Sequence, residues 1–255
     1  MIAETLRYAT PDGEAGAALL LPDAALLFPA GAGPWPLVVF CMDAFGLRPA
    51  LAEMARPFVD AGYAVVQPNL YWRAGAFAPF DARTTFSDPP ERARVMALMN
   101  GISAATVGSD TEALLEALGA DPRVRPGPVG LLGYCMGGRQ AFYLAARLGE
   151  RVAAMASIHG GGLVRADTSS PHHGAPKIRA RCYFAVADQD SACTAADCDV
   201  LGATLTAAGV PHAIELYPGA LHGFAAPDMA VYDAAAAARH TVRVLELFGE
   251  TLTAP

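Results

Sequence analysis

Three residues of this sequence could together carry out nucleophilic catalysis: Cys135, Asp190 and His222. A cysteine nucleophile needs a base within hydrogen-bonding reach, and that base needs a third group to hold its tautomer. Each of the three follows a segment with the character of a buried strand, and the carboxyl ends of parallel strands meet at one edge of a sheet. The chemistry predicted is attack of a sulfur on the carbonyl carbon of an ester-like bond.

Cys135 occupies a turn between a predicted strand and a predicted helix. Residues 129–138 run as an apolar strand into Gly133 and then through a G-x-C-x-G motif, and residues 139–149 have helical spacing. The motif resembles the nucleophile elbow of the α/β-hydrolases, with cysteine in the place of serine. A buried structural cysteine is the alternative. We favour the nucleophile because the strand, the turn and the helix all fall where the motif requires them.

The order of the three residues also matches that fold. In α/β-hydrolases the nucleophile comes first, the acid second and the histidine last, as Cys135, Asp190 and His222 do here. Asp188 leaves the same strand as Asp190 and is an alternative acid, although it is closer to the strand and could simply end it. His159 is an alternative base, but it precedes the acid in the chain.

A second predicted loop could complete the site. Residues 36–42 form a continuous apolar run, typical of a strand buried on both faces, and a helix is expected at 49–62. In α/β-hydrolases the loop between these two elements donates one backbone N–H to the oxyanion hole, and the residue after the nucleophile donates the other. The predicted donors are the N–H groups of Ala44 and Met136. Cys41, inside the strand, is predicted to be part of the core.

The remaining elements predict an α/β fold. An antiparallel hairpin at a sheet edge is expected from residues 5–8 and 16–21 around a Pro-Asp-Gly turn. Further strands are expected at 63–68, 151–158, 181–187 and 211–217, further helices at 92–98, 106–119, 195–209 and 228–248, and a long loop covering a pocket at 74–90. With 255 residues and 53% apolar content, we expect one domain over residues 1–255, with a mostly parallel central sheet flanked by helices.

Several conspicuous residues are interpreted as structural. The H-G-G-G motif at 159–162 forms oxyanion loops in lipases, but there it precedes the nucleophile, so here a turn at a strand end is favoured. Adjacent His172 and His173 lack nearby Cys, Asp or Glu at metal-ligand spacing, which favours a solvated loop. Cys193 and Cys198, five positions apart on a helix, would point away from one another. We therefore predict no metal site and no cysteine pair.

Composition narrows the function classes. The net charge is −7 and the arginines are scattered, which argues against a nucleic-acid partner and favours a small molecule. The five cysteines show no disulfide-dense pattern and the N-terminus lacks the features of a secretory signal, so we expect a reducing cytoplasm. The apolar stretch 15–33 is broken by Pro22, Asp23 and Pro29, so it cannot supply the roughly 20 apolar residues of a membrane span.

Five motifs together resemble the dienelactone hydrolase (carboxymethylenebutenolidase) family over residues 36 to the C-terminus: M-D-A-F-G, P-N-L-Y-W-R, G-Y-C-M-G-G, D-Q-D and G-A-L-H-G-F. The resemblance implies a hydrolase that opens enol-lactone or ester bonds through a cysteinyl acyl-enzyme. It places the family's triad on Cys135, Asp190 and His222. It implies no metal and no organic cofactor.

The sequence departs from that family around the substrate. Asp43 stands where the family has a glutamate that modulates the nucleophile. Arg94 matches one of two arginines that bind the substrate carboxylate, whereas Ala226 replaces the other and Leu98 replaces a tyrosine of the same pocket. These changes make the pocket more apolar, so the substrate is expected to differ from dienelactone. Besides Arg94, we expect two aromatic residues to contact the substrate, Tyr134 and Phe224.

Two classes of function remain open from the sequence. The first is a cysteine hydrolase acting on a small ester, lactone or thioester, as a monomer or homodimer. The second is a non-catalytic α/β-hydrolase-like protein in which Cys135 binds a ligand or senses oxidants without turnover. Hydrolysis of an activated ester that depends on Cys135 would distinguish them.

Overall fold

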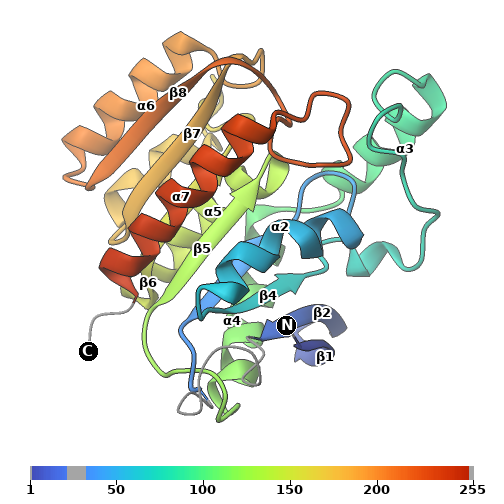
Figure 1. Ribbon diagram of the computed structural model, residues 1–255, viewed down its shortest axis with the longest axis vertical. Coiled ribbons are helices and arrows are strands. Elements are labelled where there is room, and N and C mark those ends of the chain that lie inside the picture. Colours follow the sequence, from blue (N-terminus) through green and yellow to red (C-terminus); the bar gives the residue numbers. More distant parts are fainter. Residues whose placement is uncertain (1, 22–32, 253–255) are drawn as a thin grey trace.

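Alternating strands and helices build a mixed sheet covered by helices on both faces (Figure 1). The computed structural model describes residues 2–21 and 33–252. Its eight-stranded sheet has the order β1-β2-β4-β3-β5-β6-β7-β8. The strands are β1 (Ile2–Thr10), β2 (Gly13–Leu21), β3 (Leu37–Cys41), β4 (Ala64–Pro68), β5 (Val129–Tyr134), β6 (Val152–Ile158), β7 (Arg181–Gln189) and β8 (His212–Leu221).

The sheet is parallel from β4 to β8, and the first two strands are antiparallel. β1 pairs with β2 through a tight turn at residues 11–12, and β2 pairs antiparallel with β4. The pairs β3–β4, β3–β5, β5–β6, β6–β7 and β7–β8 are all parallel. This arrangement is the α/β-hydrolase fold with an N-terminal antiparallel hairpin at one edge, as the sequence predicts.

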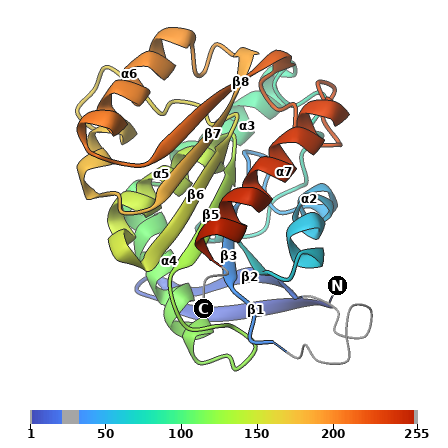
Figure 2. The same ribbon diagram turned by 60° about the vertical axis from the view of Figure 1, so that its left-hand side comes forward.

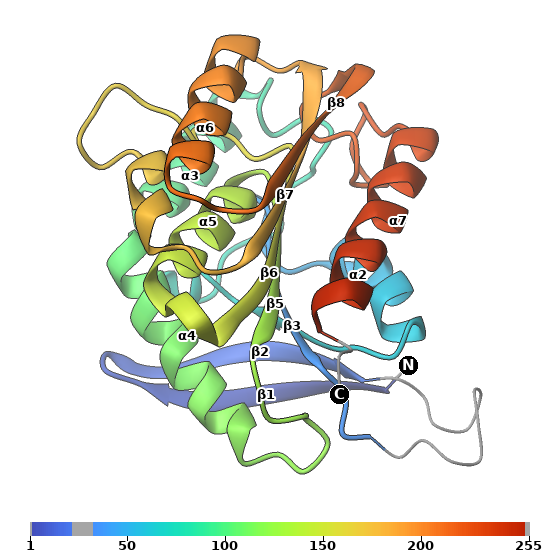
Figure 3. The ribbon, with the colours of Figure 1, turned by 90° about the vertical axis from the view of Figure 1, so that its left-hand side faces the viewer.

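Helices lie on the two faces of the sheet. They are α2 (Pro49–Asp60), α3 (Pro89–Asn100), α4 (Ala104–Gly119), α5 (Met136–Leu148), α6 (Ala195–Ala207) and α7 (Ala234–Thr251), with short 3-10 turns η1 (Trp72–Ala74), η2 (Gly149–Arg151) and η3 (Pro171–Lys177). Figure 3, which looks along the sheet, shows α2 and α7 on one face and α4, α5 and α6 on the other. The view in Figure 2 shows the same division, with α7 crossing in front of β5.

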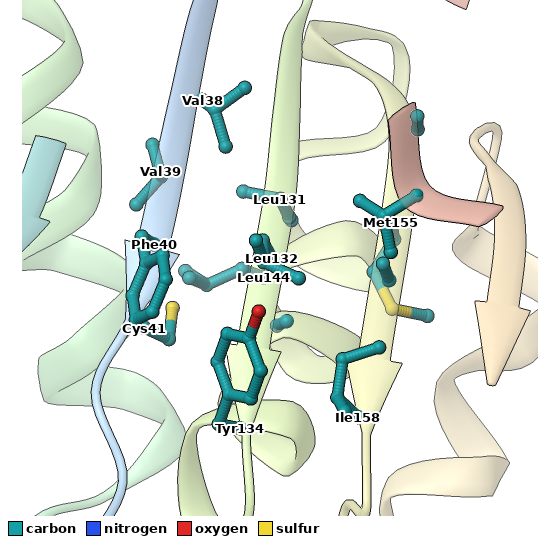
Figure 4. Close-up of a cluster of buried hydrophobic side chains, with 14 of the residues drawn as sticks. Val38, Val39, Phe40, Cys41, Leu131, Leu132, Tyr134, Leu144, Met155 and Ile158 are labelled. Carbon is teal, nitrogen blue, oxygen red and sulfur yellow. The ribbon is translucent and has the colours of Figure 1, made fainter. Parts of the chain in front are cut away.

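The core lies where the central strands are buried on both faces. All five residues of β3 and all six of β5 are buried, which explains why both appear in the sequence as apolar runs without alternation. The rings of Phe40 and Tyr134 stack at 4.9 Å between the two strands (Figure 4). These strands provide the rigid base from which the loops at the carboxyl edge of the sheet project.

Each residue of the predicted triad is the first residue beyond a parallel strand. Cys135 follows the end of β5, Asp190 follows the end of β7 and His222 follows the end of β8. Because all three strands run in the same direction, these ends lie along one edge of the sheet. The fold therefore brings together residues that are up to 87 positions apart in the chain.

The structure corrects four expectations. The C-terminal helix begins at Ala234 rather than 228, because the Asp233 side chain accepts hydrogen bonds from the first-turn N–H groups. His172 is buried in η3, where Nδ1 lies 2.7 Å from Ser170 Oγ, and is not in a solvated loop. β8 continues past 217 to 221. Cys193 lies before α6 rather than within it, so the helical-wheel argument that separated it from Cys198 does not apply.

No helix within residues 2–21 and 33–252 is long and apolar enough to cross a membrane. Residues 22–32 of the apolar stretch at 15–33 lie outside the described residues. Residue 1 and residues 253–255, at the ends of the predicted domain, also lie outside them. The region 74–90 consists mainly of turns and irregular segments, as expected for a long loop, until α3 begins at Pro89.

Candidate active site

Cys135 lies on a sharp turn between β5 and α5, with φ of 54° and ψ of −118°. A positive φ is unfavourable for a residue with a side chain, so the surroundings must enforce it. A Cβ atom on Gly137 would stand 2.3 Å from the Cys41 carbonyl oxygen, and one on Gly133 would stand 2.1 Å from the Gly137 carbonyl oxygen. The two glycines of the G-x-C-x-G motif therefore allow the close contacts between strand and helix that fix the turn.

Cys135, His222 and Asp190 form a continuous polar chain. His222 Nε2 lies 3.0 Å from Cys135 Sγ, and His222 Nδ1 lies 2.7 Å from Asp190 Oδ2. The other carboxylate oxygen of Asp190 accepts the backbone N–H of Ala192 at 2.8 Å. The Asp190 side chain is 1% exposed, whereas Cys135 is only partly buried. This geometry is the one that a nucleophile, its base and an orienting acid require.

His222 is stabilised in its charged form by its two partners. Burial alone disfavours the imidazolium, but the charge on Cys135 and the hydrogen bond to Asp190 outweigh that effect and raise the pKa of His222 to about 10. At neutral pH His222 is therefore an imidazolium, and its Nε2 lies 3.0 Å from the Cys135 sulfur. A positive charge beside a cysteine is a setting typical of a nucleophilic sulfur.

Asp188 and His159, the alternative acid and base, lie outside the hydrogen-bonded chain of Cys135, His222 and Asp190. Asp188 Oδ2 accepts the backbone N–H of Gly219 at 2.9 Å, so its carboxylate stabilises the irregular part of β8. The His159 ring is buried, and neither of its nitrogens has a hydrogen-bond partner among the described residues. Burial, together with His222 and His240, keeps the pKa of His159 well below its usual range. His159 packs edge-on against His222, with ring centroids 5.2 Å apart, and makes no hydrogen bond to Cys135.

The two predicted oxyanion donors lie on adjoining segments. Met136 begins α5, and Ala44 is buried in the loop after β3. The Tyr71 hydroxyl donates to the Ala44 carbonyl oxygen at 2.9 Å and lies 3.5 Å from Met136 Sδ, so it contacts both segments. No hydrogen bond from the N–H of Ala44 or Met136 occurs within the described part of the chain. Both groups are thus available to a ligand. Tyr71 belongs to the P-N-L-Y-W-R motif, but the sequence analysis assigned it no role.

Asp43 is paired with an arginine rather than with the nucleophile. Arg48 donates to both carboxylate oxygens of Asp43, at 2.6 and 2.9 Å, and to both of Asp228, at 3.0 and 2.5 Å. Asp43 Oδ1 also accepts the backbone N–H of Phe45 at 3.0 Å. The structure places no hydrogen bond between Asp43 and Cys135, although Asp43 stands where the related family has a nucleophile-modulating glutamate. Arg48 instead connects Asp43, in the loop after β3, to Asp228 in the loop before α7.

Neither Arg48 nor Asp228 was identified as a functional residue from the sequence. The only local signal is an arginine five positions after Asp43. Asp228 is 180 positions away from Arg48, and the predicted helix at 228–248 included it. A contact over that distance follows from the assembled sheet and cannot be read from local spacing.

Arg94 is already bound by groups of its own neighbourhood. Its guanidinium forms an ion pair with Glu91, donates to the Ala78 carbonyl oxygen at 2.6 Å, and lies over the Phe80 ring at 3.9 Å from the centroid. Phe80 in turn packs in a small buried cluster with Ala44. Arg94 is therefore close to the loop after β3, but its donors are largely engaged.

The other substrate-contact predictions fall on buried residues. Tyr134 is 1% exposed and Phe224 is fully buried, so neither presents its ring to a ligand at Cys135. Ala226 is also buried, and Leu98 lines a separate pocket of about 200 Å³ with Tyr71 and Ile102. The burial of Tyr134 and Phe224 corrects the expectation of substrate contact. Both rings instead pack around His159 on the inner side of the triad.

A larger pocket lies on the opposite face of the sheet from α5. It has a volume of about 510 Å³ and is lined by residues of α2 and α7, with Tyr134 and His240 at its buried end. The Tyr134 hydroxyl and His240 Nδ1 have no hydrogen-bond partner among the described residues. Burial lowers the pKa of His240 to about 3, so its ring is neutral. Across residues 2–21 and 33–252, no group of three or more His, Cys, Asp or Glu side chains is arranged to hold a metal ion.

The fold and the turn at Cys135 define an α/β-hydrolase, and comparison with known proteins specifies the family. The profile of the dienelactone hydrolase family matches residues 23–252. The chain is 31% identical to a "putative carboxymethylenebutenolidase" of Synechocystis sp. over 86% of this chain and 88% of that protein. The chain therefore belongs to the dienelactone hydrolase family, and is a hydrolase of the class that acts on ester or lactone bonds.

Solved structures agree on the fold. A "putative dienelactone hydrolase" from Klebsiella pneumoniae superposes with a TM-score of 0.80 at 21% identity, over 98% of this chain and 100% of that chain. A dienelactone hydrolase-like promiscuous phosphotriesterase from metagenomic libraries superposes with a TM-score of 0.79 at 24% identity, over 98% of both chains. At these identities the likeness concerns the fold alone.

Proposed function

We propose that this protein hydrolyses a small, uncharged ester or lactone through a cysteinyl acyl-enzyme formed on Cys135. The observation that carries the proposal is the chain of contacts from Cys135 Sγ through His222 to Asp190, at 3.0 and 2.7 Å. These distances lie within the reach required of a nucleophile, its base and the group that orients the base.

The reaction begins with attack of the Cys135 sulfur on the carbonyl carbon. Negative charge moves onto the carbonyl oxygen, where the N–H groups of Ala44 and Met136 can donate to it. His222 then gives its proton to the leaving oxygen as the carbon–oxygen bond breaks. This step leaves an acyl group on sulfur and, for a lactone, a hydroxyl that remains attached to the acyl group.

Hydrolysis of the acyl-enzyme reverses these roles. His222, now neutral, removes a proton from water, and the hydroxide attacks the thioester carbonyl at the same pair of N–H donors. Collapse of the intermediate breaks the carbon–sulfur bond and releases the carboxylic acid, so Cys135 returns to its thiolate form. Asp190 keeps Nδ1 of His222 protonated, which leaves Nε2 to exchange protons with sulfur, leaving group and water.

The preference for an uncharged substrate follows from the positive groups near the site. Arg94 is bound to Glu91 and the Ala78 carbonyl oxygen, and Arg48 is bound to Asp43 and Asp228. A substrate carboxylate would have to displace one of these acceptors. An ester or lactone without a charge avoids that competition.

Turnover of p-nitrophenyl acetate by the purified protein tests the proposal. We expect Cys135→Ala to abolish turnover, whereas the matched variant Cys198→Ser, which removes a thiol outside the triad, should retain it. A mass increase of one acetyl group on Cys135 after rapid acid quenching would identify the acyl-enzyme. Turnover that survives in Cys135→Ala would contradict the mechanism, and binding of esters without turnover would favour a ligand-binding protein.

A further inference from the structure

Two thiols lie side by side immediately beyond the acid of the triad. Cys193 Sγ and Cys198 Sγ are 3.9 Å apart, and both cysteines are free. Cys193 lies in the turn after Asp190, while Cys198 is in the first turn of α6. Since Thr194 is the residue that caps α6, the chain changes direction between the two cysteines, and this change brings their side chains together.

The turn that carries Cys193 is the turn that positions Asp190. The backbone N–H of Cys193 donates to the Asp190 carbonyl oxygen at 3.4 Å, and the N–H of Ala192 donates to Asp190 Oδ1 at 2.8 Å. The Ala192 carbonyl oxygen accepts the N–H of Gly162 at 2.8 Å. A displacement of Cys193 would therefore be transmitted to Asp190 through these hydrogen bonds of the turn.

The two thiols differ in access and in charge. Cys193 is 3% exposed, whereas Cys198 is only partly buried. The hydrogen bond between the two sulfur atoms lowers the pKa of Cys198, although burial and nearby Asp197 and Asp199 oppose the effect. Cys198 is thus the thiol that a small oxidant can reach and the one that more readily forms the reactive thiolate.

We propose that Cys193 and Cys198 are a site of reversible oxidation, at which a hydroperoxide converts the two thiols to a disulfide and thereby slows turnover at Cys135. The Cys198 thiolate attacks the outer oxygen of the peroxide, which forms a sulfenic acid and releases an alcohol, or water when the oxidant is hydrogen peroxide. Cys193 then attacks the sulfenic sulfur, and the hydroxyl leaves as water. The two thiols together supply the two electrons that the peroxide accepts.

Formation of the bond requires movement next to Asp190. The sulfur atoms must approach from 3.9 Å to about 2.05 Å. Cys198 is held in α6, whose first turn is fixed by the reciprocal Thr194 and Asp197 capping bonds. The short non-helical segment at 190–193 must therefore absorb most of the movement. That segment carries the carboxylate that orients His222.

The disulfide itself is tested in the Cys135→Ala variant, so that the catalytic thiol does not react. The protein is treated with hydrogen peroxide, its free thiols are alkylated, and it is cleaved on the amino side of Asp197, between the two cysteines. We expect the fragments containing Cys193 and Cys198 to remain joined until dithiothreitol is added. Fragments that separate, with both cysteines alkylated after peroxide treatment, would overturn the proposal. This result does not depend on catalysis.

The effect on turnover rests on the proposed function and is measured separately. Wild type and Cys198→Ser are oxidised in parallel, and the intact Cys135 in each sample is counted by alkylation and mass spectrometry. Per intact Cys135, we expect about tenfold slower hydrolysis in oxidised wild type, reversed by dithiothreitol, and no change in Cys198→Ser. If the disulfide forms but turnover per intact Cys135 is unchanged, the proposed effect of the disulfide on catalysis through Asp190 would be overturned.

Discussion

Arg48 binds both carboxylate oxygens of Asp43, at 2.6 and 2.9 Å, and so fixes the loop that carries one of the two proposed oxyanion donors. The Arg48 side chain is 12% exposed, and its other partner, Asp228, belongs to the loop before α7. Two loops beside the triad are thus connected through one guanidinium. Asp43, which stands where the related family has a nucleophile-modulating glutamate, is thus bound to Arg48.

Replacement of Arg48 by methionine should reduce both stability and turnover. The Asp43 carboxylate would be left buried without its partner, at a cost of up to about 3 kcal/mol, and the shifted Ala44 N–H should lower kcat by about tenfold. The matched control is Arg56→Met, because Arg56 forms only an exposed pair with Asp60. Thermal melting and kcat on p-nitrophenyl acetate are the measurements. A lower Tm with unchanged kcat would show that the bridge serves stability alone.

The charge on His222 should make stability depend on pH. Its pKa is raised from 6.5 in the unfolded chain to about 10 in the folded protein, so this contribution to stability is fully present below pH 6.5 and is lost as the pH rises through about 10. We expect the Tm of wild type to fall between pH 7 and pH 10. In Cys135→Ala the fall should be smaller, because the charge on Cys135 is a principal cause of the shift. Equal slopes for the two proteins would argue against the ion pair.

The two aspartates after β7 should differ in their effect on catalysis. Asp190→Asn removes the acceptor that holds the His222 tautomer, and kcat should fall by orders of magnitude, about 10⁴-fold in the best-studied triad. Asp188→Asn keeps a side-chain oxygen that can accept the Gly219 N–H and should change kcat by less than about threefold. Kinetics of both variants on one ester make the comparison. A severe loss in Asp188→Asn beside a nearly normal Asp190→Asn would reverse the assignment.

Arg94→Ala should hardly alter the choice between charged and neutral substrates. The guanidinium is already paired with Glu91 and stacked on Phe80, so its loss should change the ratio of kcat/KM for matched carboxylate-bearing and neutral esters by less than about twofold. A guanidinium free to bind a substrate carboxylate would contribute roughly tenfold or more. If kcat/KM fell tenfold for the carboxylate-bearing ester alone, Arg94 would have to leave Glu91 and bind the substrate.

The fold and the order of the triad could be predicted because they depend on local sequence. The apolar run of β5 and the glycines around Cys135 identify the elbow, and Asp190 and His222 each directly follow a strand with its own apolar signal. These features need only the period of a strand and the steric demands of a turn. The structure adds the distances, which the sequence alone does not contain.

The features that sequence reasoning missed depend on side chains brought together from different segments. The bridge from Asp43 through Arg48 to Asp228 joins loops 180 positions apart. The predicted helix start at 195 agrees with α6, but Cys193 lies before that helix, so helical periodicity does not describe the pair, and the turn at Thr194 brings the two sulfur atoms together. The burial of Phe224 depends on the ring of Tyr217 in β8 and on the ring of His159, which follows β6.

The placement of the three proposed triad residues after β5, β7 and β8 also bears on synthesis of the protein. Cys135 leaves the ribosome well before His222, which is 87 positions later in the chain, and β7 and β8 must join the sheet before the thiol meets its base. A nascent or truncated chain that ends before His222 would carry the cysteine without the group that activates it. The activated cysteine would therefore exist only in a polypeptide whose sheet is complete. Incomplete chains would lack this reactivity.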